Sequence, residues 1–129
     1  MVLGPTAGVR TAAAQDTDTC MMCHDDRSLT KNERGQVKSL YVDVAQYGKS
    51  VHGKEGVACV DCHQALSGVE DFPHNENLPD VDCGGCHDDI ATQYAGSLHG
   101  VGVAKGVPIA PRCWTCHGAH DIRPPADPE

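Results

Sequence analysis

The residues best suited to chemistry in this chain of 129 residues are eight cysteines and eight histidines. The cysteines form four pairs with the spacing C-x-x-C, and a histidine follows each pair directly. The pairs are Cys20/Cys23, Cys59/Cys62, Cys83/Cys86 and Cys113/Cys116, followed by His24, His63, His87 and His117. C-x-x-C-H is the attachment motif of c-type haem, so the sequence predicts four covalently bound haem c groups.

The spacing of the motif has a mechanical reason. Residues three apart on a helical turn share a face, so both thiols can reach the two vinyl groups on one porphyrin edge. The next residue then directs its imidazole at the iron. Structural zinc, a disulfide framework and thioredoxin-like redox pairs also use C-x-x-C, but none of them requires a histidine after every second cysteine.

The other four histidines equal in number the sixth ligands that four haems need. Methionine is the common alternative ligand, but Met21 and Met22 lie between the cysteines of the first motif and Met1 is the terminus. We therefore expect four bis-histidine irons whose second ligands are His52, His74, His99 and His120. On a helical turn His120 and His117 would point the same way, so His120 is expected to serve a neighbouring haem.

The chain also contains an internal repeat, in which Gln46-Tyr-Gly-Lys-Ser-Val-His-Gly53 matches Gln93-Tyr-Ala-Gly-Ser-Leu-His-Gly100. Each copy precedes a further motif, at a distance of 7 residues from His52 and 14 from His99. We expect an N-terminal extension at 1–16, one tetrahaem domain at 17–123 and a C-terminal tail at 124–129. The domain would consist of two dihaem repeats, 17–76 and 80–123.

Composition excludes several classes of protein. The formal net charge of −8 argues against nucleic acid or anionic lipid as a partner, because both require a basic surface. No stretch approaches the ~20 apolar residues of a membrane helix, so no membrane span is expected. Only 4% of the residues are aromatic, and a core made of side chains alone would be thin. The core is therefore expected to come from bound groups.

Periodicity predicts a helix over about 36–51, from the apolar stripe that runs from Val37 to Val51, with Gly53 as its stop. A shorter equivalent would end at His99-Gly100. Elsewhere glycine and proline favour irregular structure, so we expect a mostly irregular fold with short α-helices and negligible β-sheet. If helical, Arg27, Lys31, Arg34 and Lys38 would form one cationic stripe, which is either a solvated face or a docking patch.

Two stretches, Cys113–Asp121 (CWTCHGAHD) and the paired S-x-H-G segments, resemble the multihaem cytochrome c superfamily. They are most similar to small tetrahaem periplasmic cytochromes and to the tetrahaem domain of flavocytochrome fumarate reductases. The resemblance implies a small multihaem fold wrapped around four haems that shuttles electrons at low potential. It also implies redox proteins as donor and acceptor.

Electron transfer is the expected function, as a soluble carrier or a module of a redox complex, and an enzymatic activity is not expected. One alternative is a multihaem oxidoreductase with one open haem site. Others are a subunit of a cytochrome filament or homo-oligomer, and a zinc-binding interaction module. Haem c is attached outside the cytoplasmic membrane, so a periplasmic or extracellular location is expected, although residues 1–14 lack a convincing signal peptide.

Overall fold

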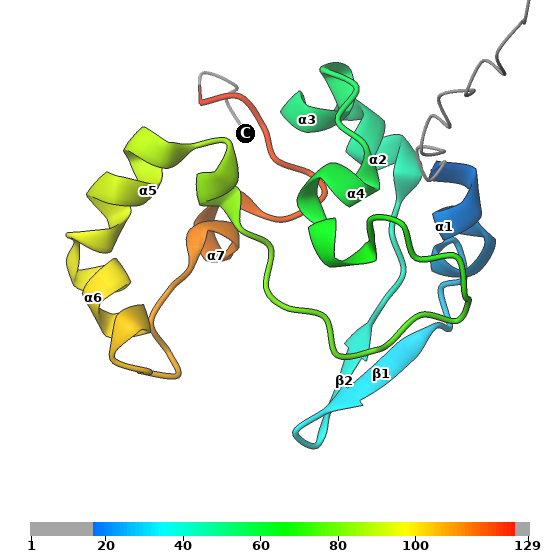
Figure 1. The fold of residues 1–129 in the computed structure, drawn as a ribbon, viewed down its shortest axis with the longest axis horizontal. Coiled ribbons are helices and arrows are strands. Elements are labelled where there is room, and N and C mark those ends of the chain that lie inside the picture. Colours follow the sequence, from blue (N-terminus) through cyan, green and yellow to red (C-terminus); the bar gives the residue numbers. More distant parts are fainter. Residues whose placement is uncertain (1–16, 126–129) are drawn as a thin grey trace, which may run out of the picture.

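Short helices joined by long irregular segments make up most of the chain in the computed structural model, which describes residues 17–125 (Figure 1). The expected extension at 1–16 and the last four residues of the expected tail lie outside the described residues. In chain order the elements begin with α1 (Thr17–His24), β1 (Thr30–Glu33), β2 (Gln36–Ser39), α2 (Val44–Lys49), α3 (Val51–Lys54) and α4 (Cys59–Cys62). The 3-10 turns η1 (Gln64–Leu66) and η2 (Cys83–Gly85) follow, and then α5 (Asp88–Ala95), α6 (Leu98–Ala104) and α7 (Cys113–His117). The predicted fold class is confirmed.

The predicted helix over 36–51 is wrong in its first half, because residues 30–39 form an antiparallel hairpin of β1 and β2 and α2 begins only at Val44. Arg34 and Gly35 both have positive φ, 54° and 82°, as the two-residue turn that matches strand twist requires. The side-chain oxygen of Asn32 accepts the Gly35 N–H at 2.9 Å. Local turn chemistry therefore overrides the helical spacing, and the cationic stripe does not exist as a helix face.

The remainder of that predicted helix is broken at Ser50. Asp43 caps the start of α2, and Ser50 caps α3 by accepting the N–H of Gly53 at 3.0 Å. Gly53 is thus inside a helix and is not a stop signal. A side chain at Gly53 would collide with the backbone carbonyl of Tyr47, so the close approach of the two helices requires glycine there.

The second copy of the repeat breaks in the same way between α5 and α6. Ser97 accepts the N–H of Gly100 at 3.2 Å, and a side chain at Gly100 would collide with the carbonyl of Tyr94. The expected helix end at His99-Gly100 is therefore wrong, because both residues lie in the first turn of α6. Each S-x-H-G segment starts a new helix and places its histidine at the second helical position.

No hydrophobic side chain among residues 17–125 is fully buried. Leu98 and Ile109 are 91% and 90% exposed, and Ser50 is the single buried polar residue of the described part. A chain of this size ordinarily hides its aliphatic side chains from water. The described chain lacks the side-chain core that would hold such a fold together.

The elements spread along the long axis of the molecule. Figure 1 shows α1 at one end and α5 and α6 at the other, with α2, α3, α4 and α7 between them and the hairpin projecting below. The C-terminal segment returns to the first half, where the carbonyl of Ile122 accepts the N–H of Val51 at 2.9 Å. Within the described residues, no helix is both long and apolar enough to cross a membrane.

Candidate haem-binding sites

Each C-x-x-C pair lies on a helical turn, as its spacing predicts. The first pair is in α1, the second forms α4, the third opens with η2, and the fourth begins α7. Two of these turns are capped alike: Asp61 accepts the N–H of Ala58 at 2.7 Å, and Thr115 accepts that of Arg112 at 3.0 Å. In both turns, the side chain of the residue before the second cysteine accepts a hydrogen bond from the N–H of the residue before the first cysteine. We number the four sites 1 to 4 in chain order.

The two cysteines of a pair are not equally covered by the protein. The first cysteine of each motif is half-buried, and so is Cys62, but Cys23, Cys86 and Cys116 are exposed. The exposure of these three thiols differs from the enclosed position expected of side chains that hold a cofactor. The physical reason is that the described chain has no hydrophobic side-chain core to enclose them. A thioether requires the thiol to be accessible to the haem edge, so Cys23, Cys86 and Cys116 stay predicted attachment residues.

Three of the four motif histidines face one of the remaining histidines. The ring centroids of His24 and His74 are 6.1 Å apart with an interplanar angle of 13°. Those of His52 and His87 are 6.0 Å apart, and those of His63 and His120 are 6.2 Å apart. Every pair joins one motif histidine with one of the four outside the motifs, as bis-histidine ligation requires.

The separation of these rings fits an axially ligated metal. An imidazole nitrogen binds a metal at about 2 Å and lies about 1 Å from its ring centre, so two imidazoles on opposite sides of one metal have centroids about 6 Å apart. Aromatic rings in simple contact also fall between about 4.5 and 7 Å. The one-to-one matching of motif and spare histidines distinguishes ligand pairs from such contacts. The residues present therefore fit a haem with two axial histidines.

Hydrogen bonds orient the two histidines of site 1. The Nδ1 of His24 donates to the carbonyl of Leu40 at 2.6 Å, and the Nδ1 of His74 donates to the carbonyl of Asn75 at 2.9 Å. A ring that donates from Nδ1 leaves Nε2 unprotonated for a metal. Leu40 directly follows β2, so the hairpin supplies the group that fixes the tautomer of His24.

Burial acts on the two histidines of site 2. Loss of solvent lowers the pKa of His63, and the nearby His120, His24 and His74 lower it further. Partial loss of solvent also lowers the pKa of His120, although the residue is exposed at the surface and the charge of Asp121 opposes the shift. Both rings therefore favour the neutral form, which is the form that binds metals.

Site 4 differs from the others. Within residues 17–125, neither His117 nor His99 has another imidazole at a comparable distance. Both side chains are exposed. His99 nevertheless occupies the same position in α6 as His52 does in α3, after an equivalent serine cap.

Two tyrosines of the repeat tie each distal-histidine segment to the next motif. The hydroxyl of Tyr47 donates to the carbonyl of Val57, and that of Tyr94 donates to the carbonyl of Pro111 at 2.7 Å. Val57 and Pro111 each lie two residues before the first cysteine of a motif. The sequence analysis missed these tyrosines as site residues, although their equivalent places in the repeat are a signal that could have identified them.

The thiols do not resemble those of a redox-active pair. Burial raises the pKa of Cys62 and of Cys83, and Cys83 also lies within hydrogen-bonding range of Cys113. Reactive cysteines in C-x-x-C pairs have instead a lowered pKa. In the described part of the chain, no three or more of His, Cys, Asp and Glu gather where they could hold a metal ion. A haem iron needs only two protein ligands, since the porphyrin supplies four nitrogens.

Comparison with known proteins adds one match. Residues 45–118, more than half of the chain, match the family described as cytochrome c7 and related cytochrome c. This chain belongs to that family. No curated protein and no solved structure matches the chain.

Membership of the cytochrome c7 family establishes the general chemistry. The chain is a small multihaem c-type cytochrome that binds haem c covalently and transfers electrons, and the resemblance to multihaem cytochromes is confirmed. The matched segment contains the second, third and fourth motifs, with His52, His74 and His99. The first motif and His120 lie outside it.

Proposed function

We propose that the protein is an electron carrier with four haem c groups, each bound by one C-x-x-C-H motif and closed on its other face by a second histidine. The observation that carries this proposal is the matching of three motif histidines with three spare histidines at 6.0–6.2 Å. Site 1 then uses His24 and His74, site 2 uses His63 and His120, and site 3 uses His87 and His52.

Site 4 is assigned by elimination to His117 and His99. The equivalence of His99 with His52 in the repeat supports this assignment, because both histidines follow a serine cap at the second position of a helix. An oxidoreductase would need an open axial position, and site 4 is where such a position would lie. The repeat favours ligation by His99, so the carrier is preferred.

The sites follow one another in chain order. Site 1 neighbours site 2, since His24 and His74 act on the charge of His63. Site 2 neighbours site 3, since Cys86 contributes to the raised pKa of Cys62. Site 3 neighbours site 4 through Cys83 and Cys113. This order supports a path for electrons from site 1 through sites 2 and 3 to site 4.

The residues of the chain supply position and environment for this path. When bound, haem c supplies an iron that gains or loses one electron. The cysteines would hold each group on a helical turn, and the paired histidines would bind its iron. Hydrogen bonds such as that from His24 to Leu40 hold the imidazoles in one orientation, which keeps the ligand set the same in both oxidation states.

A reductive titration tests the proposal. We expect the oxidised protein to take up four electrons per chain, and Cys59→Ala/Cys62→Ala to lower this number to three. Uptake of fewer than four electrons by the unmodified chain would contradict four functional sites.

We also propose a periplasmic or extracellular location, with redox proteins as electron donor and acceptor. Cell fractionation followed by haem staining tests the location.

A further inference from the structure

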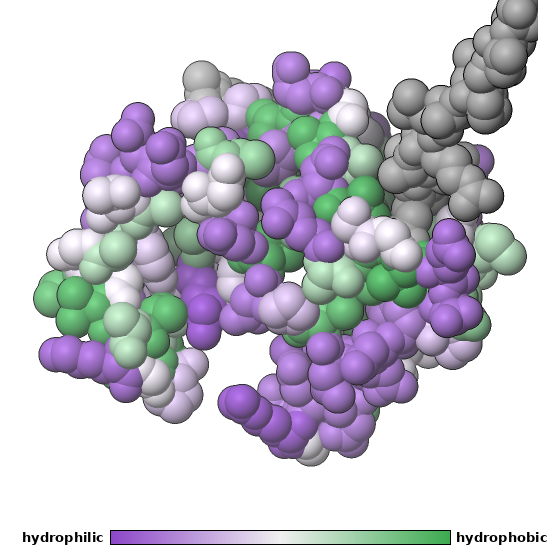
Figure 2. Space-filling view, in the orientation of Figure 1, coloured by the Kyte–Doolittle hydropathy of each residue, from purple (hydrophilic) through white to green (hydrophobic). Residues whose placement is uncertain are grey.

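The hairpin of β1 and β2 projects from one edge of the molecule, and its two strands pack mainly on each other (Figures 1 and 2). All four residues of β2 are exposed, and Val37 is 72% exposed. An isolated two-stranded hairpin is marginally stable in water. Packing between its two strands therefore gives the hairpin little stability of its own.

The hairpin is basic in an acidic protein. Residues 30–39 contain Lys31, Arg34 and Lys38 against the single acid Glu33, which is a local charge of +2 in a chain whose formal charge is −8. The register places Lys31 opposite Lys38, so both lysines are on one face. At physiological ionic strength charges more than about 8 Å apart are largely screened, so an approaching protein senses this local charge.

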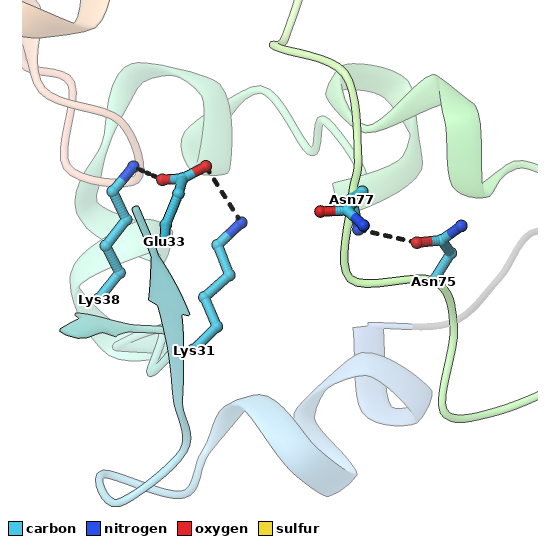
Figure 3. Close-up of polar contacts among 5 residues, drawn as sticks. All are labelled: Lys31, Glu33, Lys38, Asn75 and Asn77. Atoms are coloured by element: carbon cyan, nitrogen blue, oxygen red, sulfur yellow. Dashed lines mark hydrogen bonds and ion pairs between the residues drawn. The ribbon is translucent and has the colours of Figure 1, made fainter. Parts of the chain in front are cut away.

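Glu33 holds the two lysines together. Its carboxylate pairs with Lys38 and lies 3.8 Å from Lys31, and Figure 3 shows both ammonium groups converging on it. The hydrogen bond from Lys38 and the charge of Lys31 lower the pKa of Glu33, so its carboxylate is ionised at neutral pH. Lys38 and Arg34 remain exposed and available to a partner.

This hairpin is joined directly to site 1. Leu40, the residue after β2, accepts the hydrogen bond from His24, and its N–H donates to the carbonyl of Leu29 at 2.9 Å, just before β1. A protein bound to the hairpin would thus lie next to the terminal site of the array.

We propose that the hairpin Thr30–Ser39 is the docking surface for an acidic redox protein, which exchanges electrons with the haem of site 1. This inference rests on the proposed function. In the exchange, one electron passes from the reduced partner to the ferric iron of site 1, with no bond made or broken. The opposite end, around α6, is apolar, with Leu98 and Ile109 exposed, and does not offer the same attraction.

The test uses a reduced acidic ferredoxin of the plant type as the probe, whose low potential favours reduction of the cytochrome. Its rate of electron transfer to the oxidised holoprotein is followed by stopped flow over a range of salt. Docking at the hairpin predicts a rate that falls as salt increases. A rate that rises with salt would show that the overall repulsion between two acidic proteins governs the encounter, and would overturn the proposal.

Matched charge reversals locate the surface. Lys38→Glu is expected to lower the rate at low salt about tenfold, within the range known for electrostatic steering. Lys105→Glu changes the net charge equally at the exposed end of α6 and should have a much smaller effect. Equal losses in the two variants would contradict a local docking site.

A third variant distinguishes a change of charge from unfolding of the hairpin, because it should change the rate in the opposite direction. Glu33→Gln raises the local charge and is expected to increase the rate about twofold, while a decrease would count against the proposal. Every variant is first reduced by a small neutral mediator, and an unchanged number of electrons shows that the proposed carrier function is intact. Failure of the unmodified protein in that control would reject the carrier function and not the docking surface.

Discussion

At the scale of single residues, the proposed haem sites depend on which histidine lies opposite which. The sequence predicts the identity of all eight, because the motifs and the count of spare histidines are local features. It does not predict the pairing, because His52 and His87 are 35 positions apart and His63 and His120 are 57 apart. Only the folded chain brings such distant residues to one place.

Substitution of His74 tests the pairing at site 1. His74→Met is expected to raise the reduction potential of one haem, because a thioether ligand favours the reduced iron more than imidazole does. Spectroelectrochemistry measures this change. In a chain that also carries Cys20→Ala/Cys23→Ala, the same substitution should have no further effect, since its haem is absent. A persisting shift in that background would place His74 at another site.

At the scale of elements, the two helix breaks are the features that the sequence predicts least well. The apolar spacing from Val37 to Val51 favours one helix, but Arg34 and Gly35 close a hairpin and Ser50 starts a new helix. The turn at Arg34-Gly35 and the cap at Ser50 each involve only one or two residues. An apolar periodicity that extends over fifteen residues is therefore the stronger signal in the sequence, and it favours the wrong structure. The equivalence of the two repeat copies, in contrast, was predicted from sequence.

The glycines at the breaks are expected to be indispensable. Gly53→Ala and Gly100→Ala should each destabilise the holoprotein by about 2 kcal/mol, because the new methyl group meets a backbone carbonyl that belongs to the preceding helix. Thermal unfolding measures the loss. Gly48→Ala is the control, since a side chain there meets open space. A loss at Gly48 equal to that at Gly53 would mean that helix flexibility, and not close approach, explains the effect.

The hydroxyls of Tyr47 and Tyr94 are expected to contribute equally to the free energy of unfolding, although the loops of the two repeat copies differ in length. Tyr47→Phe and Tyr94→Phe each remove one hydrogen bond to the segment before a motif, at a cost of about 1 kcal/mol. Chemical denaturation followed by haem absorbance measures it. Tyr41→Phe keeps the ring that lies under Arg27 at 4.5 Å and should change little. If Tyr41→Phe were as costly as the other two, the proposed fastening of motifs by tyrosine would be wrong.

At the scale of the whole molecule, the histidine pairs interlock the two halves of the repeat. His52 of the first half lies opposite His87 of the second, and His120 of the second half lies opposite His63 of the first. The chain end reinforces this exchange through the bond from Val51 to Ile122. Because each half would supply ligands to the other in the proposed assignment, we expect one cooperative tetrahaem domain and not two separable dihaem units.

Cooperative unfolding of the two halves is the corresponding prediction. Thermal loss of haem-region absorbance and of far-ultraviolet circular dichroism should have one common midpoint, since the proposed histidine pairs join the two halves. If the halves were independent, residues 17–76 and residues 80–123 would melt at different temperatures. Two resolved transitions would show that the halves fold independently.

The most direct test of the central claim is the absorption spectrum of the reduced protein before and after carbon monoxide is added, with haem measured per chain. The account predicts four haems per chain and no change with carbon monoxide, because two histidines close every iron. Four haems of which one binds carbon monoxide would contradict the assignment of His99 to site 4 and would favour an enzyme. Fewer than four haems would contradict the tetrahaem array itself.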